Sequence, residues 1–275
     1  MTAVRTADAL RVPRPEGTPT VGTVIATVAM RSGRKLMRSM PILGISIIQS
    51  LVFLFMFRYV LGGAIGVGGF DYVDFLVPGY VVAGLLFTAG GGAVGTAEDA
   101  ESGLFDRLRS LPISDTGTLV GKILADSVLI IVVALVTLAA GFAVGFRVSG
   151  SFVEFLFALV LLVPYALTVA ALFTLLGLVS GSAQAAQGLS ILAVPFSFIS
   201  SAFVPISTMP QVLQWIADWQ PLTFMVNSWR GLMLGDEMVA SFDHSLGFYI
   251  VGSLLWCAVL SGLALALALR AYRKE

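Results

Sequence analysis

The sequence is poor in the residues from which most catalytic and metal sites are built. Its 275 residues include one cysteine, Cys257, and one histidine, His244. One cysteine excludes a disulfide framework within the chain and any multi-cysteine metal cluster, and one histidine leaves little room for a zinc site or a histidine-based triad. Charged residues make up 12% of the chain, against about 25% in soluble domains. The formal net charge of zero argues against nucleic acid as a partner.

Long apolar runs take the place of the missing charge. Hydrophobic residues make up 57% of the chain, and several uncharged runs approach or exceed the roughly 20 residues that a helix needs to cross a bilayer. The sequence therefore predicts an all-α membrane protein, with one six-helix transmembrane domain over residues 40–275. The predicted spans cover residues 41–61, 75–97, 119–146, 152–178, 186–203 (interrupted by Pro195) and 244–269.

Two segments precede the first predicted span. Residues 1–19 contain prolines and scattered charges without periodicity, which predicts a flexible cytoplasmic tail. Residues 20–39 combine an apolar helical face with a basic end, and the apolar part is too short to span a bilayer. This pattern predicts an amphipathic helix in the cytoplasmic interface, and the alternative is an extended first span with a basic flank. The basic residues of this helix are Arg31, Arg34, Lys35 and Arg38.

Lysine and arginine are distributed unevenly between the two sides of the predicted spans. Thirteen of the 16 lie before the first span, around the segment that joins the second and third spans, or after the last span, and three lie on the other side. Basic residues concentrate in cytoplasmic segments. The sequence therefore predicts that both termini and residues 98–114 are cytoplasmic, and that the chain lies in the cell inner (plasma) membrane.

A charged segment, Glu98–Ser114, joins the second and third predicted spans. Its centre predicts a short coupling helix whose apolar strip inserts into the groove of a partner protein, while flanking charges set the register. A solvated linker is the alternative, although a linker needs no apolar strip. The two glutamates of the segment could bond the arginines of the interfacial helix or the partner. The predicted contact residues are Glu98, Glu101, Leu104, Phe105, Asp106, Arg107, Leu108, Arg109, Leu111 and Pro112.

Two short helical segments lie between the fifth and sixth predicted spans. Residues 211–220 place apolar side chains at helical spacing but are too few to cross a bilayer, and Pro221 separates them from residues 224–234. Tryptophans are enriched at membrane interfaces, so we expect an outer hairpin of two half-helices that dips into the leaflet. Its characteristic residues are Pro210, Trp215, Trp219, Pro221, Trp229 and Arg230.

The sequence contains no evident energy source. The nearest match to a P-loop, residues 117–123, is one residue short, lacks the Ser or Thr and opens an apolar span. A self-powered carrier would normally show carboxylates or broken helices near the midplane. Lys122 and Asp126, at i and i+4, are expected to form a local ion pair instead. We therefore expect no catalytic, cofactor or metal site on this chain, and an energy supply from a partner.

Two motifs resemble those of a known family. Residues 101–114, ESGLFDRLRSLPIS, resemble the first cytoplasmic loop of the type-2 ABC transporter permeases. Residues 209–231 resemble the outer hairpin that precedes the last span of these proteins. The resemblance covers almost the whole chain and is in particular to the daunorubicin/doxorubicin-resistance group of export permeases.

The resemblance implies a transporter subunit and not an enzyme. It implies a dimer of permease chains, the same or homologous, with separate ATPase subunits that bind ATP and Mg. Such a complex exports an amphipathic drug or lipid from the cytoplasm or inner leaflet, which gives antibiotic resistance, and membrane lipids surround it. The first, second and fifth spans would line the path, with apolar contacts from Phe53, Phe57, Phe87, Phe196, Phe198 and Phe203. The alternatives are a membrane scaffold or lipid-handling protein that ATP does not drive, and a secondary carrier.

Overall fold

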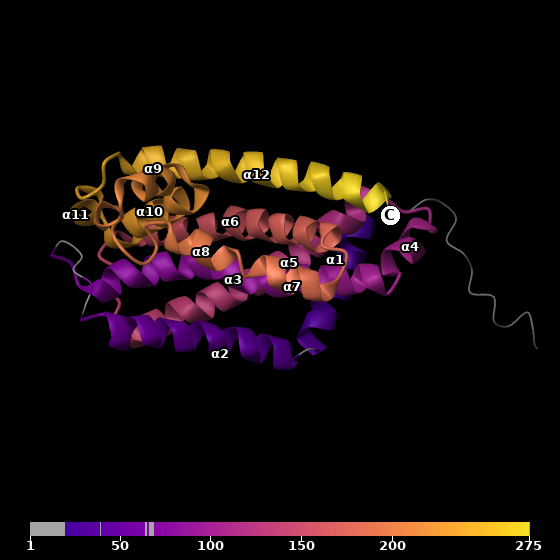
Figure 1. The fold of residues 1–275 in the computed structure, drawn as a ribbon, viewed down its shortest axis with the longest axis horizontal. Coiled ribbons are helices and arrows are strands. Elements are labelled where there is room, and N and C mark those ends of the chain that lie inside the picture. Colours follow the sequence, from indigo (N-terminus) through magenta and orange to yellow (C-terminus); the bar gives the residue numbers. More distant parts are fainter. Residues whose placement is uncertain (1–19, 39, 64, 66–68, 275) are drawn as a thin grey trace, which may run out of the picture.

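The chain folds into a bundle of helices that run mostly along its long axis (Figure 1). The computed structural model describes residues 20–38, 40–63, 65 and 69–274. Within these residues it contains helices and no strand, so the all-helical prediction is confirmed for this part of the chain. The flexible tail predicted for residues 1–19 lies outside the described residues.

Four helices are long and apolar enough to cross a membrane. They are α3 (Tyr72–Glu101), α5 (Asp115–Ala143), α6 (Phe152–Val179) and α12 (Leu246–Lys274). A shorter apolar stretch, Gly44–Val60, lies in α2 (Met40–Met56) and in the π-helical turn η2 (Phe57–Leu61) that follows it. These helices agree with the predicted membrane class, whereas the count of six spans stays a prediction.

The other helices in the described part of the chain are shorter. They are α1 (Val21–Arg38), α4 (Leu104–Arg109), α7 (Ala183–Ser190), α8 (Ala193–Phe198), η3 (Ile206–Thr208), α9 (Gln211–Trp219), α10 (Pro221–Leu234) and α11 (Asp236–Val239). The helices α9, α10 and α11 gather at one end of the bundle, and α4 lies at the other end with the C-terminal end of α12 (Figure 1). We call these the α10 end and the α4 end.

The segment predicted as the fifth span consists of two helices. α7 ends at Ser190, α8 begins at Ala193 and ends at Phe198, and residues 199–205 form turns and irregular backbone. Pro195 accounts for the first break, because a proline supplies no N–H to the carbonyl four residues earlier and its ring clashes with that carbonyl. The predicted interruption is therefore present, as a full break between two helices.

Small residues allow the central helix α3 to pack closely against its neighbours. α3 contacts α5, α6, α7 and α10 and is buried along most of its length. At Gly177 of α6, a Cβ atom would press on the carbonyl oxygen of Ala93 and lie 2.7 Å from the Cβ of Thr96, both in α3. Gly177 therefore sets the separation of the two helices, as small residues do where helices pack in lipid.

α1 packs against the N-terminal half of α5. Val24 of α1 is buried, and an added Cβ at Gly117 of α5 would lie 3.0 Å from its Cγ1 atom. At Gly121, one turn further along α5, an added Cβ would lie 2.9 Å from the Cβ of Val28. The pair of glycines one turn apart thus forms the groove that receives the apolar face of α1.

The helix predicted over residues 20–39 is present from Val21 to Arg38, and its interfacial position stays a prediction. Arg31 and Arg34 are exposed on it. Lys35 and Arg38 belong to its last turns, and their side chains lie outside the described part of the structure.

We expect Gly177→Ala to destabilise the bundle and Gly262→Ala to leave it equally or more stable. An added Cβ at Gly262 of α12 meets no atom within 4 Å, so that change gains about 1 kcal/mol of helix propensity. At Gly177 the same gain is offset by overpacking that costs about 1–3 kcal/mol. Thermal unfolding of both variants in detergent measures the difference. Equal increases in the unfolding temperature would contradict the close approach of α3 and α6.

Candidate functional site: the short helix α4 and the residues around it

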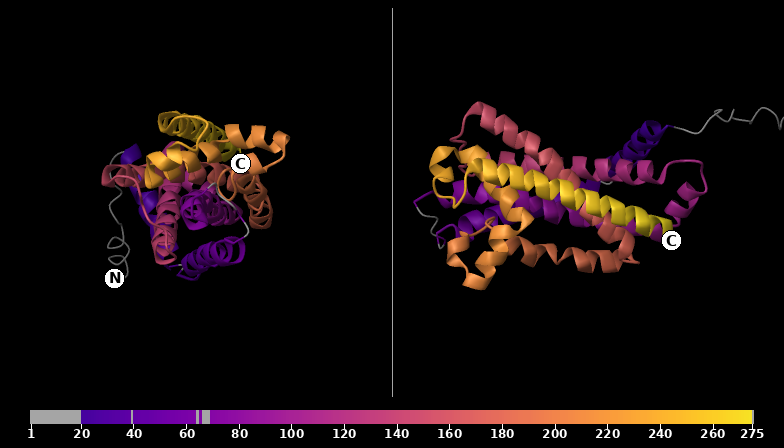
Figure 2. Two further views of the ribbon diagram at one scale, coloured as in Figure 1. Left: turned by 90° about the vertical axis from the view of Figure 1, so that its left-hand side faces the viewer. Right: turned by 90° about the horizontal axis from the view of Figure 1, so that it is seen from above.

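α4 is a single short helix between α3 and α5 at the end of the bundle (Figure 2, right). The chain leaves α3 through Ser102, whose N–H donates to the carbonyl of Glu98, and turns at Gly103, which has a φ of 66°. Only glycine adopts this left-handed conformation without cost. The turn therefore allows α4 to start directly after α3 in a new direction.

Phe105 holds α4 against the bundle. Its side chain is 3% exposed, and its ring meets the edge of the Tyr272 ring of α12 at a centroid distance of 5.3 Å. The guanidinium of Arg109 lies over the same tyrosine ring, 5.1 Å from its centre. Leu119 and Leu178 belong to the same buried cluster. Phe105 and Arg109 therefore anchor α4 to the end of α12.

The position of Phe105 differs from the role predicted for the apolar strip of α4. The apolar strip was expected to face a partner, but Phe105 faces Tyr272 of its own chain, because the C-terminal turn of α12 reaches α4. Leu104 and Leu108 are partly exposed. The surface that remains available to another molecule consists mainly of Asp106, Arg107, Leu111 and Pro112, which are exposed.

Glu101, the last residue of α3, links the end of that helix to the start of α7. One of its carboxylate oxygens, Oε1, accepts a hydrogen bond from the backbone N–H of Ala183 at 3.1 Å. The hydroxyl of Ser182 accepts from the N–H of Ala185 at 3.1 Å, so two side chains satisfy the first N–H groups of α7, which have no partner within the helix. The sequence had suggested the arginines of α1 or a partner for Glu101. Glu98 is exposed, one turn before Glu101 on α3.

A cavity separates α4 from the helices behind it. It holds about 220 Å³ and is lined by Glu101, Phe105 and Arg109 on one side and by Gly177 and Gly181 on the other. α4 thus touches α12 through Phe105 and Arg109 and has space beneath it, while the end of α3 just before it holds α7 through Glu101. A displacement of α4 would act on α12 directly and on α7 through the end of α3.

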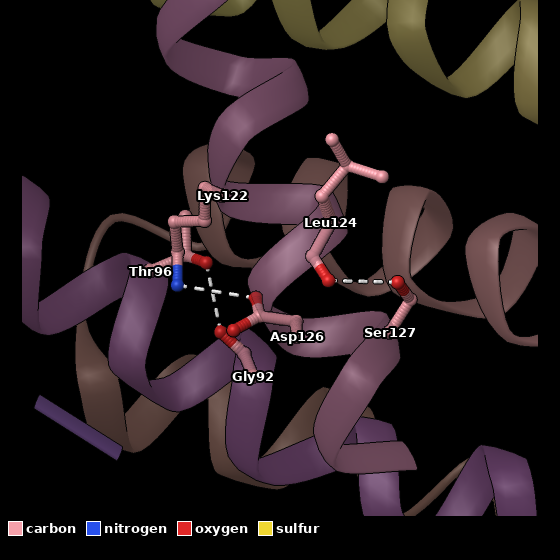
Figure 3. Close-up of polar contacts among 6 residues, drawn as sticks. All are labelled: Gly92, Thr96, Lys122, Leu124, Asp126 and Ser127. Atoms are coloured by element: carbon pink, nitrogen blue, oxygen red, sulfur yellow. Dashed lines mark hydrogen bonds and ion pairs between the residues drawn. The ribbon is translucent and has the colours of Figure 1, made fainter. Parts of the chain in front are cut away.

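A mostly buried ion pair lies in α5 beside α3 (Figure 3). The Nζ atom of Lys122 donates to Oδ2 of Asp126 at 3.1 Å, so the predicted i, i+4 pair is confirmed. The residue of α3 that faces this ion pair is Gly92. An added Cβ at Gly92 would lie 3.3 Å from the same Oδ2 atom of Asp126. Gly92 therefore makes room for the pair between the two helices.

The α10 end differs from the predicted hairpin in one of its tryptophans. Trp215 and Trp219 of α9 are 70% and 64% exposed, as expected for side chains at an interface. Trp229 of α10 is fully buried, and its Nε1–H donates to the carbonyl of Ala158 at 2.6 Å. The expectation that Trp229 lies at the interface is wrong, because α10 packs inside the bundle against α3, α6 and α12. Pro210 directly precedes α9, and Pro221 is the first residue of α10.

Arg230 is also inside the bundle, with 1% of its surface exposed. Its Nε and Nη2 atoms donate to the carbonyl of Phe75 at 3.2 and 3.0 Å, and Nη2 donates to the carbonyl of Ser201 at 2.7 Å. The guanidinium carbon lies 3.7 Å from the centre of the Phe75 ring. Arg230 therefore connects α10 to α3 and to the irregular segment after α8.

The six phenylalanines proposed for a substrate path do not surround one cavity. Phe57 and Phe203 are buried and stacked, with ring centres 4.8 Å apart, and Phe198 stacks on Phe203 at 4.7 Å. Phe53 and Phe87 line a small pocket between α2 and α3. Phe196 is exposed on α8. The three stacked rings join η2 to the end of α8, and a role for any of the six in transport stays a prediction.

Sequence reasoning missed two groups of this site, Tyr272 and the N-terminus of α7. Tyr272 lies among basic residues at the end of the last span, and Ala183 contributes only a backbone N–H. No local sequence pattern marks either group. Tyr272 contacts Phe105, and the N–H of Ala183 donates to Glu101, and in both cases the two residues are far apart in the sequence.

We expect Lys122→Met to destabilise the protein more than the double change Lys122→Met with Asp126→Leu. The single change takes the Lys122 partner from the Asp126 carboxylate, and loss of one partner of a buried ion pair costs about 3–5 kcal/mol, whereas loss of both charges is often nearly neutral. Denaturation in detergent gives both values. A double variant that is less stable than the single one would contradict this account.

Comparison with known proteins agrees with the resemblance. Residues 68–270 match the ABC-2 family transporter proteins. The chain is 31% identical over 233 residues to the daunorubicin resistance ABC transporter permease protein DrrB1 of Streptomyces coeruleorubidus, covering 83% of this chain and 78% of the relative. It is 24% identical over 218 residues to the probable doxorubicin resistance ABC transporter permease protein DrrC of Mycobacterium tuberculosis, covering 78% and 75% of the two chains. This chain therefore belongs to the ABC-2 family of transporter proteins and is a permease subunit, not an enzyme.

Proposed function

We propose that the chain exports an amphipathic drug or lipid, driven by a separate ATPase subunit that contacts the exposed face of α4. The observation that carries the proposal is the position of α4. The helix projects from the end of the bundle, offers charged and apolar side chains outward, and is tied by Phe105 to α12, while Glu101, at the end of α3 just before it, is tied to α7. The relatives named for daunorubicin and doxorubicin resistance support a drug-like substrate.

The proposed topology has six membrane crossings. α2 with η2, α3, α5, α6, the pair α7–α8, and α12 each run along the bundle axis and alternate in direction (Figure 1). The excess of basic residues at the α4 end supports a cytoplasmic position for that end and for both termini, in the cell inner (plasma) membrane. α1 then lies at the cytoplasmic interface, and α9 and α10 form the outer hairpin.

The proposed mechanism transmits force through α4. A second permease chain, the same or homologous, completes the transporter, and each chain meets one ATPase. When ATP and Mg bring the two ATPases together, the two copies of α4 move. Because Phe105 contacts Tyr272 and Glu101 holds the start of α7, the displacement reaches α12 and the interrupted fifth crossing. The bundle can then open toward the outside, as in other transitions between packed states that a ligand biases.

The surface of α4 and its anchor have separable effects in this mechanism. We expect Arg107→Ala with Leu111→Ala to lower substrate-stimulated ATPase activity and co-purification of the ATPase by tenfold or more, with an unchanged unfolding temperature, because both side chains are exposed. We expect Phe105→Ala to lower the unfolding temperature as well, because emptying a buried aromatic site costs about 3–5 kcal/mol. Nanodiscs that hold this chain and its ATPase allow both measurements.

Val212→Ala is the matched control, since Val212 is exposed on α9 at the opposite end of the bundle. It should leave both activity and association unchanged. If the Arg107→Ala, Leu111→Ala variant behaves like this control, α4 is a linker and the proposed contact is wrong.

A further inference from the structure

A cavity at the α10 end carries charges of both signs on its walls. It holds about 340 Å³, within the roughly 300–1,000 Å³ that small-molecule pockets occupy. Arg230 of α10, Asp218 of α9 and Asp243 before α12 all line it. In the described part of the chain, neither carboxylate has a hydrogen-bond or ion-pair partner, and the guanidinium of Arg230 has no carboxylate partner.

Arg230 supplies the positive end of the cavity. Its Nε and Nη2 atoms are held by the carbonyls of Phe75 and Ser201, whereas Nη1 makes one long hydrogen bond, 3.4 Å to Oδ1 of Asn227. The guanidinium is thus fixed in place with donor capacity remaining at Nη1. Asn227 lines the cavity beside it. A guanidinium that is fixed and buried in this way suits the oxygens of a phosphate or carboxylate.

Asp218 and Asp243 supply the negative end. The two carboxylates also line a smaller adjoining cavity together with His244 and the rings of Trp219 and Tyr249. Burial raises the pKa of the Asp218 carboxyl, and the charge of Asp243 raises it further, while His244 opposes them. An ammonium group between the two carboxylates would relieve their repulsion, and aromatic faces attract such a cation.

We propose that this cavity binds a zwitterion that carries a phosphate and an ammonium group, with the phosphate at Arg230 and Asn227 and the ammonium at Asp218 and Asp243. A plain cation would meet the charge of Arg230, and a plain anion would meet the two carboxylates. The phosphoethanolamine headgroup of a membrane lipid has both groups, and a soluble phosphoethanolamine compound shares them. The exposed Trp215 and Trp219 on the adjacent α9 favour the lipid, because tryptophans lie at headgroup depth.

The binding test uses three soluble probes on the purified full chain in detergent. Glycerophosphoethanolamine carries both charges, glycerol phosphate carries the anion, and ethanolamine carries the cation. A ligand that binds the folded protein raises its unfolding temperature in proportion to the logarithm of its concentration above Kd. We expect an increase with the zwitterion that grows in this way with its concentration, and at least tenfold weaker binding of either half. If glycerol phosphate or ethanolamine binds as tightly as the zwitterion, or if no probe raises the unfolding temperature, the proposal is overturned.

A fourth probe, a short-chain phosphatidylethanolamine, separates the two sources of the same chemistry. Tighter binding than that of glycerophosphoethanolamine assigns the site to a lipid headgroup, and equal binding assigns it to a soluble zwitterion. Both results support the site itself.

Variants test the negative end without disturbing the buried arginine. Asp218→Asn with Asp243→Asn should weaken binding of the zwitterion roughly tenfold or more, because each removes a charge that faces the ligand. Asp236→Asn is the matched control, since Asp236 is an exposed carboxylate of α11 that does not line the cavity. Identical binding by the double variant and the control would overturn the proposal. The readout needs no ATPase, so its failure and a failure of ATP-driven transport are independent results.

Discussion

The structure depends on hydrogen bonds to backbone carbonyls where a helix is interrupted inside the bundle. A membrane interior offers no water to such carbonyls, so protein groups must satisfy them. After α8 the chain is irregular, and the carbonyl of Ser201 accepts from Arg230 while that of Ile199 accepts from the side-chain amide of Gln220. Because Arg230 also donates to Phe75 of α3, one side chain joins the interrupted segment to the central helix. The break after α8 is thus a defined part of the fold.

At the α4 end the same chain uses contacts between distant segments to position a helix of only six residues. A helix of this length is not stable by itself, so its orientation must come from its neighbours. Tyr272 fixes one face through Phe105 and Arg109, and the turn at Gly103 fixes the direction in which the helix leaves α3. Rigid attachment is what allows a short helix to transmit a displacement instead of absorbing it.

Local patterns in the sequence predicted much of this arrangement. The apolar runs, the i, i+4 pair of Lys122 and Asp126, and the proline at position 195 each act over a few residues, and the structure contains the helices, the ion pair and the break that they indicate. The direction of Phe105 and the burial of Trp229 depend on α12 and α6, which are distant in sequence. An aromatic side chain on a short helix fits lipid, a partner or the core equally well, so its pattern alone does not decide between them.

The contact between Phe105 and Tyr272 also has a practical consequence for work with the isolated protein. Any polypeptide that follows Tyr272 emerges beside α4. An affinity tag or fluorescent protein fused there would occupy the space around Asp106 and Arg107, the exposed residues of that helix. A fusion at this end would compete with the ATPase for its proposed contact surface, so labels are better placed away from it.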